Sequence, residues 1–353
     1  MNPASTRSSS GSDAYRLIKV FRPRKCASSA SRDYQQVDES CQVMRSEIGR
    51  RRFLKQASLS MLALPASAVA RHGMRTKVPS AGDLLPLQNQ LLSLVNQERT
   101  AAGLTVLKLD ELACRVAEQH AIDMAEHAFL SHWGRDGRKP YQRYSFAGGT
   151  DAIEENDGAT DHGAPIASEE IASDLISMHT SMHDEAPPND GHRKTILGAQ
   201  HNHVGFGLAC RGLHVRLSEL YVARYVAVDP HLSSARPRSK FIFSGRVLNP
   251  AYSVETIDVF YEALPAPPKL SWLRTPRSYS MPDERNTLRP RLAEDRDYID
   301  GSKGSIEFYG RGRFRVPIKL SNKTPGIYTI VVWIQKFGLT TPFPATQVCV
   351  RAE

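Results

Sequence analysis

Residues 191–209 read GHRKTILGAQHNHVGFGLA, and the way the chain enters this stretch determines the fold and the candidate chemistry. The preceding residues 185–190, EAPPND, contain two prolines, which prevent a helix from continuing. The Asp-Gly pair that follows them is typical of a tight turn. We expect this turn to direct His192 inward, with Arg193 reaching a backbone carbonyl or a carboxylate as a structural brace.

Helical and strand patterns lie on both sides of this stretch. LLPLQNQLLSLVNQER places leucines at helical spacing, with Asn96 and Arg99 on the other side of the helix. Asp110 is expected to cap a second helix. A polar, Gly-containing segment over 147–163 predicts a loop. The expected helices cover 84–99, 111–128 and 165–183, a short helix is expected after the loop 131–144, and the expected strands are 203–210 and 219–230.

The C-terminal region, from residue 230, has strand-like alternation and no helix-length pattern. Its runs are separated by proline and glycine turns, a spacing that predicts a small all-β sandwich. The runs are KFIFSGRVL (240–248), TIDVFYEAL (256–264), GSIEFYG (304–310), RFRVPIKL (313–320) and GIYTIVVWIQKF (326–337).

Charge divides the chain into unlike regions. The 353 residues carry a formal net charge of +9, of which residues 1–70 contribute +7 (12 basic minus 5 acidic). Residues 84–229 carry −8 (12 minus 20), whereas residues 230–353 carry +8 (19 minus 11). Because the basic excess is concentrated in the first 70 residues, the overall charge does not indicate a nucleic-acid-binding protein.

The N-terminal residues resemble an export leader. RRRFLK at 50–55 precedes ASLSMLALPASAVA at 57–70, whose small residues predict cleavage near 68–70. The arginine pair resembles a twin-arginine signal, which implies a bacterial protein exported after folding, to the periplasm or the outside. The predicted order is a disordered or mis-assigned extension (1–43), a signal peptide (44–70, with Met44 a more natural start), a linker (71–83), a first domain (84–229) and a β-rich domain (230–353), with no transmembrane span after signal removal.

Cysteines are few in the region expected after cleavage. Cys114, Cys210 and Cys349 are widely spaced and form no disulfide framework. Each is expected to be a small buried apolar residue, with a Cys114–Cys210 bridge as the lesser alternative.

Ten of the twelve histidines lie between residues 120 and 214, where polar motifs occur in a fixed order. This order resembles the bacterial branch of the CAP superfamily, which comprises cysteine-rich secretory, antigen 5 and pathogenesis-related proteins. The motifs are Val95-Asn96 with Arg99, Ser131-His132 with Asp136-Gly137, Arg143, Glu155-Asn156, His192-Arg193 with Ile196-Leu197, and Val204-Gly205 with Gly207.

The resemblance covers residues 84–229 and implies an α+β architecture, a three-layer α-β-α sandwich with a central cleft. Two histidines and two acidic residues converge in that cleft. Carried over to this sequence, they are His132, His192 and Glu155, with Glu185 as the second acid and Asp184 as its alternate. Imidazoles with nearby carboxylates suit a divalent metal, zinc before others, and equally a hydrogen-bonded polar cluster without metal.

Three further residues are expected to support the cleft, namely Asn156, Arg193 and Arg143. The sequence departs from the family pattern where Met178 or Met182 replaces a common tryptophan, and where EAPPND lengthens the link before His192. These departures leave the ligand class open.

Other histidines are interpreted as structural. His120 falls on the inward stripe of the second helix and is expected to be a satisfied core histidine. His179 and His183 share one helix face at i, i+4 spacing, and a solvated face is expected rather than a metal arm.

Three functions follow from these residues. The leading one is an exported binding module whose cleft holds a divalent metal or a small apolar ligand, with the basic β domain contacting a cell-envelope polymer. The second is a metal-assisted hydrolase acting on peptide or peptidoglycan, in which Glu155, His132 and His192 activate water. The third is a structural envelope protein. Binding leads because hydrolysis also needs an oxyanion donor and a substrate groove, which the sequence does not reveal.

Overall fold

The computed structural model describes residues 81–164 and 166–353, and in its first helix the side chains from Leu85 onward. The predicted extension, signal peptide and most of the predicted linker lie outside these residues. Within them, no helix has the length and apolarity needed to cross a bilayer.

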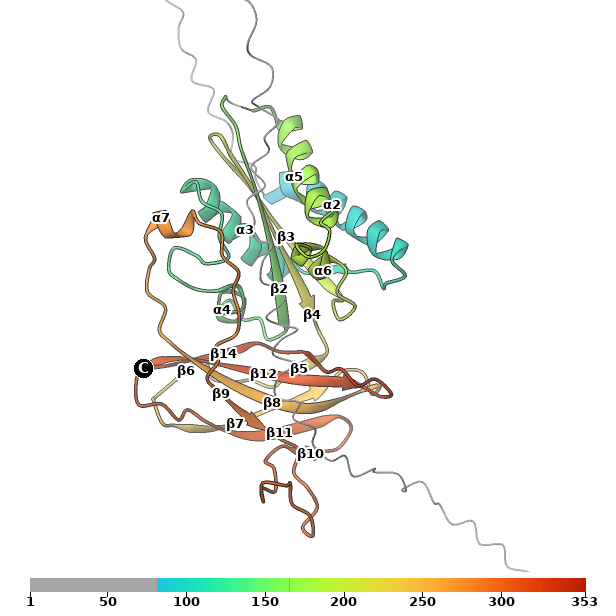
Figure 1. Cartoon of the computed structure of the whole chain (residues 1–353), viewed down its shortest axis with the longest axis vertical. Coiled ribbons are helices and arrows are strands. Elements are labelled where there is room, and N and C mark those ends of the chain that lie inside the picture. The colour runs from blue at the N-terminus through green and yellow to red at the C-terminus, as the bar shows by residue number, and fades with distance from the viewer. Residues whose placement is uncertain (1–80, 165) are drawn as a thin grey trace, which may run out of the picture. The chain divides into compact units, whose positions relative to one another are not determined.

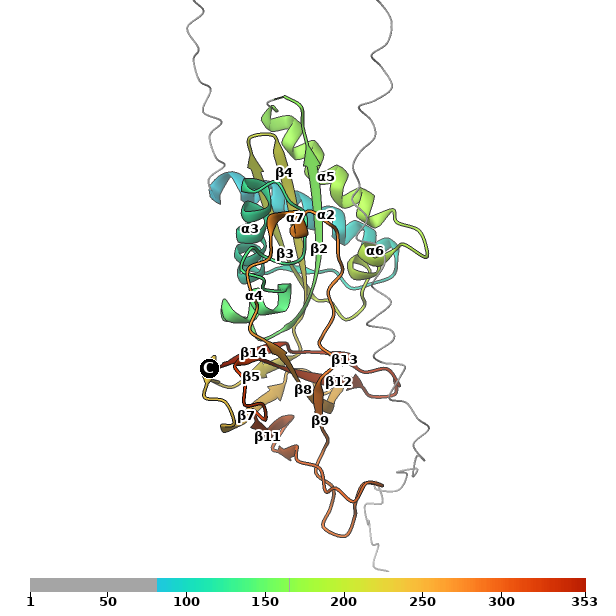
Figure 2. The ribbon, with the colours of Figure 1, turned by 60° about the vertical axis from the view of Figure 1, so that its left-hand side comes forward.

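We call the part of the chain from α2 to β4 the first region. A four-stranded sheet of order β1-β3-β4-β2 forms its centre. Helices cover both faces (Figures 1 and 2), with α3 and α4 on one side and α2, α5 and α6 on the other. The predicted three-layer α-β-α arrangement is therefore confirmed. The strands are Lys108–Leu109 (β1), Ala152–Asp161 (β2), His203–Arg211 (β3) and His214–Ala223 (β4). The helices are Ala81–Ala101 (α2), Glu111–Glu126 (α3), Pro140–Phe146 (α4), Ser168–His183 (α5) and Gly191–Ile196 (α6).

The expected cap of α3 is present, because Asp110 accepts a hydrogen bond from the Ala113 nitrogen at 2.7 Å. The turn before His192 differs from the prediction. The chain turns over residues 186–189, and a short helix, α6, begins at Gly191. His192 therefore lies in the first turn of a helix rather than after a tight Asp-Gly turn.

The glycines of the Val-Gly-Phe-Gly motif bring β3 against α3. A Cβ added at Gly205 would lie 2.3 Å from the Ala113 carbonyl carbon, and one at Gly207 would lie 2.0 Å from the corresponding atom of Ala117. The alternate residues of β3 point to the opposite face, where Phe206 packs in the core shared with α2 and α5. The motif thus sets the spacing between sheet and helix layers.

Arg99, which was expected on the side of α2 away from the leucines, does not face solvent. Its side chain is fully buried and donates hydrogen bonds to four backbone carbonyls, those of Thr105, Ile196, Gly198 and His201. Burial lowers the pKa of this guanidinium. Arg99 therefore joins α2 to the segment that follows α6.

The segment expected as a Gly-rich loop over 147–163 is instead mostly strand β2, the edge strand beside β4. Polar residues dominate its sequence, so the usual apolar alternation of a strand is absent. Backbone pairing along the whole of β4 and burial beneath helices on both faces hold it in the sheet.

The C-terminal region forms the predicted β-sandwich, which begins before residue 230, because the expected strand 219–230 is divided and its second part, β5, pairs with β7. One sheet has the order β10-β11-β7-β5, and the other has β6-β14-β12-β8-β9, with β13 pairing with β12. Their inner faces share one core that includes Phe243, Phe314 and Ile330. The strands are Val226–Val228 (β5), Ser234–Ala235 (β6), Lys240–Val247 (β7), Tyr252–Ala263 (β8), Arg285–Leu288 (β9), Glu307–Tyr309 (β10), Arg313–Lys319 (β11), Gly326–Lys336 (β12), Phe343–Pro344 (β13) and Val348–Ala352 (β14).

The sandwich also contacts the first region. Between β8 and β9, residues 264–284 form a long connection that we call the arm, which contains the short helix α7 (Leu270–Leu273). Leu273 is fully buried in a cluster with Met124 and Phe129 of the first region. A Cβ at Gly137 would lie 2.4 Å from the Ala266 oxygen, so the arm also passes closely over the loop before α4.

Candidate functional site

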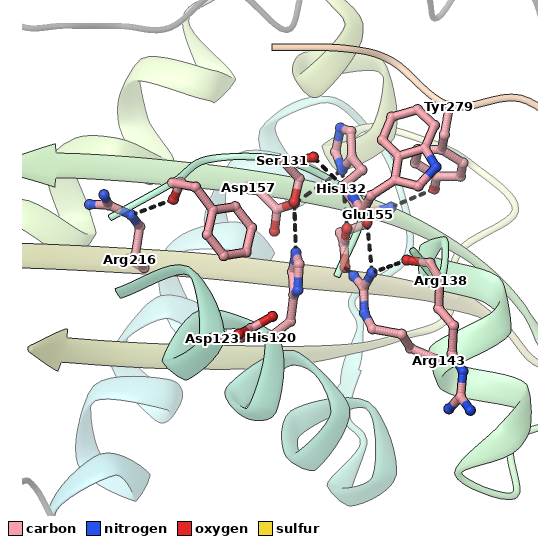
Figure 3. Close-up of polar contacts among 12 residues, drawn as sticks. His120, Asp123, Ser131, His132, Arg138, Arg143, Glu155, Asp157, Arg216 and Tyr279 are labelled. Atoms are coloured by element: carbon pink, nitrogen blue, oxygen red, sulfur yellow. Dashed lines mark hydrogen bonds and ion pairs between the residues drawn. The ribbon is translucent and has the colours of Figure 1, made fainter. Parts of the chain in front are cut away.

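Strand β2 carries the centre of the site. Because side chains alternate along a strand, Glu155 and Asp157 point to the face covered by α3, whereas Asn156 points to the face covered by α5 and α6. Figure 3 shows both carboxylates beside His132 and above His120. The residues gathered here are almost completely buried.

His132 lies between the two carboxylates. Its Nδ1 is 3.1 Å from Glu155 Oε1 and 3.1 Å from Asp157 Oδ2. The predicted partners His132 and Glu155 are therefore in direct contact, and Asp157 is a third member that the sequence interpretation omitted.

Arg143, from α4, fixes Glu155 from the other side. Its Nη2 donates to Glu155 Oε2 at 2.5 Å, and its Nη1 donates to the His132 carbonyl at 2.6 Å and to that of Arg138 at 3.1 Å. One guanidinium thus positions both the carboxylate and the loop that carries His132 (Figure 3).

His120 approaches Asp157 from α3. Its Nε2 lies 3.6 Å from Asp157 Oδ2 and 2.8 Å from the Ser131 carbonyl oxygen. Within the described residues, His120 Nδ1, Asp157 Oδ1 and Ser218 Oγ are buried without a hydrogen-bond partner, whereas Asp157 Oδ2 faces the two imidazoles. Burial alone would raise the pKa of Asp157, but His120 and His132 outweigh burial and hold this pKa well below its usual range. His120 is buried as expected, yet only one of its ring nitrogens is satisfied.

The arm supplies one wall of the site. The Tyr279 ring packs edge-on against the His132 ring with 5.0 Å between centroids, and its hydroxyl accepts the Glu155 N–H at 3.3 Å. Trp272, in the α7 part of the arm, packs edge-on against Trp133, the residue after His132, with 5.3 Å between ring centroids. A residue from the C-terminal region therefore borders a site whose other members come from the first region.

His192 and Glu185 form a second pair on the side of α5 and α6. His192 Nδ1 lies 2.5 Å from Glu185 Oε1, and the other Glu185 oxygen accepts the His192 N–H at 2.9 Å. Asn156 Nδ2 donates to the His192 carbonyl at 3.1 Å, and Arg193 donates to the His183 carbonyl. The alternate acid, Asp184, is more exposed and contacts His183. These contacts place the four predicted cleft residues in two pairs, joined through Asn156 and β2.

The solvated face expected for His179 and His183 was wrong for His179, which is fully buried. Its two ring nitrogens contact Glu219 at 2.7 Å and Glu98 at 2.9 Å. Burial disfavours the charged imidazole, but these two carboxylates outweigh it and raise the pKa of His179 to about 10. This trio joins α5, β4 and α2 through a buried charge network rather than through an exposed helix face.

A groove borders the site on the side of α3 and α4. It has a volume of about 590 Å³ and is lined by His120, Arg143 and several charged side chains, namely Asp123, Arg135, Asp136 and Arg138. All three arginines of the lining pair with carboxylates, Arg135 with Asp123, Arg138 with Asp136 and Arg143 with Glu155. The lining combines these paired charges with the apolar side chains of Val116, Phe146 and Ala147.

Three groups can hold a metal ion in this cluster. His120, Glu155 and Asp157 each present a ligand atom, and these atoms lie within 4.8 Å of one another. Two ligands of a tetrahedral zinc ion with bonds of about 2.1 Å are about 3.4 Å apart. The distances of 3.1 Å and 3.6 Å from Asp157 Oδ2 to His132 and His120 bracket that spacing.

Of the residues that the sequence interpretation missed, one left a clear signal. Asp157 follows Glu155 by two positions, which would place both on one face if the segment had been interpreted as a strand. The helical spacing correctly placed His120 on the buried side of its helix. No sequence feature showed that only one of its two ring nitrogens would have a hydrogen-bond partner. Tyr279 left no signal, because its position depends on the path of the arm.

One of the comparisons with known proteins identifies a family for part of the chain. The sequence model of the cysteine-rich secretory protein family, CAP, matches residues 92–225. The comparison with curated proteins found no match.

Several solved bacterial structures are similar to this chain. They include an outer surface protein from Borrelia burgdorferi, at 16% identity and a TM-score of 0.33 over 40% of this chain and 96% of that one. An extracellular protein containing an SCP domain from Bacillus anthracis gives 19% identity and a TM-score of 0.32 over 41% of this chain and 44% of that one. The CAP domain of enterococcal PrgA gives 15% identity and a TM-score of 0.31 over 41% and 63% of the respective chains. The match thus spans less than two thirds of the second and third of these proteins.

Residues 92–225, with their three-layer fold and their ordered histidine and carboxylate motifs, are therefore the part of the chain that matches the CAP family of cysteine-rich secretory proteins.

Proposed function

We propose that this chain is an exported CAP-domain binding protein whose cluster of His132, Glu155 and Asp157 holds a divalent metal ion, zinc before others. The observation that carries the proposal is Asp157, a buried carboxylate whose Oδ2 faces the imidazoles of His132 at 3.1 Å and His120 at 3.6 Å, while its Oδ1 has no hydrogen-bond partner among the described residues. A buried carboxylate oxygen without a donor is costly, and a cation bound between this carboxylate and the imidazoles would remove that cost.

The donor set also supports a metal. Imidazole nitrogen and carboxylate oxygen are ordinary zinc ligands, and the spacing among them is compatible with tetrahedral coordination. Arg143 holds Glu155 Oε2, so Glu155 would offer Oε1, the oxygen nearer to His132. His120 would be the fourth ligand only by giving up its contact with the Ser131 carbonyl.

A bound ion would supply positive charge and Lewis acidity at the edge of the groove. The residues of the chain would keep bulk water away from it, because the cluster is almost completely buried and the Tyr279 ring packs against His132. Export, and residence at the cell envelope, rest on the leader-like residues 50–70 and belong to the same proposal.

Metal content tests the proposal directly. The exported protein, purified without chelator, should contain about one divalent ion per chain, measured by plasma mass spectrometry. His132→Ala and Asp157→Asn should lose it, whereas the matched control His127→Ala, which alters a histidine outside the cluster, should retain it. Parent protein without any ion after zinc addition and gel filtration would reject the proposal. His192→Ala then decides whether the second pair contributes, since retention of the ion assigns binding to the first cluster alone.

Hydrolysis is the second candidate, and Tyr279 favours it. Its phenol lies beside Glu155 and is a group of the kind that stabilises an oxyanion. In this mechanism Glu155 and His132 would position a water molecule. Peptidoglycan or casein cleavage should then fall in Glu155→Gln, and cleavage unchanged by that substitution would exclude the site as its source.

A further inference from the structure

The outer face of the sandwich sheet β10-β11-β7-β5 is exposed and basic. Strands β7 and β11 are antiparallel neighbours, and their inner side chains fill the sandwich core. Figure 1 shows the two strands in the lower part of the sandwich, remote from α7. The outward residues are Lys240, Ile242, Ser244 and Arg246 on β7, and Arg313, Arg315, Pro317 and Lys319 on β11.

The strand register places like charges directly opposite one another. Lys240 pairs with Lys319, and Arg246 pairs with Arg313. Side chains in such cross-strand positions have Cβ atoms about 5 Å apart, and like charges there are unfavourable. The chain therefore maintains two repulsive pairs on one exposed face.

Acidic neighbours offset only part of this charge. Glu307 contacts Arg315 at 2.7 Å, and Asp229 lies 3.7 Å from Arg313. Lys240, Arg246 and Lys319 form no ion pair with any residue in the described part of the chain. The unbalanced cations mark a surface that an anionic partner would stabilise.

The spacing and the apolar residues of this face indicate the kind of anion. Residues two apart on a strand are about 6.8 Å apart, so the cations from Lys240 to Arg246 extend over about 20 Å. Between them lie Ile242, with 61% of its surface exposed, and its partner Pro317. At the edge, Tyr309 is 41% exposed beneath the Arg315 guanidinium. Flat apolar and aromatic surface between cations suits sugar rings that carry acidic groups.

We propose that the outer face of β7 and β11 binds an acidic polysaccharide, with Lys240, Lys319, Arg246 and Arg313 contacting its carboxylates and Ile242, Pro317 and Tyr309 its ring faces. A nucleic acid fits less well. Proteins that bind single strands without sequence preference combine a basic groove with several aromatic side chains on which bases stack, whereas this face is a flat sheet surface that carries one such residue, Tyr309. The inference shares with the proposed function only the export that would bring the chain to such a polymer, and it does not depend on the metal.

The test measures binding of the full chain to immobilised polygalacturonate, with neutral dextran, duplex DNA and anionic vesicles as alternative ligands. The double variant Lys240→Gln/Lys319→Gln should weaken polygalacturonate binding roughly tenfold, and salt should weaken parent binding. Lys108→Gln/Arg115→Gln is the matched control, since it removes two exposed charges from the first region. Its binding should equal that of the parent.

Folding stability provides an independent readout. Removing a like-charged pair should leave the Lys240→Gln/Lys319→Gln variant at least as stable to urea as the parent, so lost binding cannot be attributed to unfolding. Ile242→Ser should weaken binding without changing the charge. Equal binding by parent and double variant, an equal loss in the control pair, or a preference for DNA or vesicles over polygalacturonate would overturn the proposal. None of these results depends on metal content.

Discussion

The Tyr279 hydroxyl lies 3.3 Å from the backbone nitrogen of Glu155, so the C-terminal region reaches the strand that carries the candidate acid. The ring of the same tyrosine packs against His132. We expect Tyr279→Ala to expose this side of the cluster to water. If zinc is bound there, a colorimetric chelator should remove it faster from Tyr279→Ala than from the parent.

Tyr279→Phe is the control, because it keeps the ring and removes only the hydroxyl. Its rate of metal loss should stay close to that of the parent. Equal rates for parent and Tyr279→Ala would show that the ring does not limit access.

Arg143 provides a test of the buried charge pair with Glu155. In Arg143→Met, the Glu155 carboxylate loses its guanidinium partner while remaining fully buried. Removing one partner of a buried pair costs about 3–5 kcal/mol, which urea unfolding would measure. Arg138→Met, which alters a more exposed pair, should cost less than about 1 kcal/mol. The double variant Arg143→Met/Glu155→Gln should recover part of the loss, and no recovery would attribute the cost to packing instead.

Gly207 tests the spacing between β3 and α3. In Gly207→Ala the new methyl group would lie 2.0 Å from a backbone carbon of Ala117, which cannot rotate away. We expect a loss of about 3 kcal/mol in the free energy of unfolding, the upper end for overpacking. Gly163→Ala is the matched substitution, since its Cβ meets nothing within 4 Å. A cost below about 1 kcal/mol at Gly207 would mean that α3 shifts freely.

Two buried histidines should shape the pH dependence of stability in opposite senses. The pKa of His179 is raised to about 10, so its contribution is complete below the ordinary value of about 6.5 and is lost as the pH rises toward 10. Burial, with a smaller effect from Arg99, lowers the pKa of His201 to about 3, so its contribution is present above pH 6.5 and is lost as the pH falls toward 3.

Urea unfolding at a series of pH values measures both effects as slopes. His179→Gln should flatten the alkaline side of the curve, where the groups facing residue 179 are Glu219 from β4 and Glu98 from α2. His201→Gln should flatten the acid side. If the free energy of unfolding depended on pH in the same way in the parent and both variants, His179 and His201 would not be the groups responsible.

The sequence predicted the layers of the fold better than the membership of the site. Helical spacing, a cap at Asp110 and strand alternation depend on neighbouring residues, and a single sequence records these. The pairing of His132 with Glu155 followed from a resemblance that fixes both positions at once. Asp157 was missed because β2 is held in the sheet by β4 and not by its own apolar pattern.

Long-range contacts account for the remaining differences. His179 was expected on a solvated face and Arg99 on the side of its helix away from the leucines, yet each is buried. Their partners Glu219 and Ile196 are 40 and 97 residues away. Tyr279 reaches Glu155 across 124 residues through a connection without a regular pattern. Such contacts depend on where distant segments pack, which local periodicity does not encode.

Because Leu273 is buried between them, we expect the two regions to unfold together on heating. Its side chain lies in a cluster with Met124 and Phe129, so neither region can melt alone without wetting apolar surface that belongs to the other. Calorimetry of the intact chain should accordingly show one cooperative unfolding transition. A ligand that binds either region should raise the melting temperature of both regions.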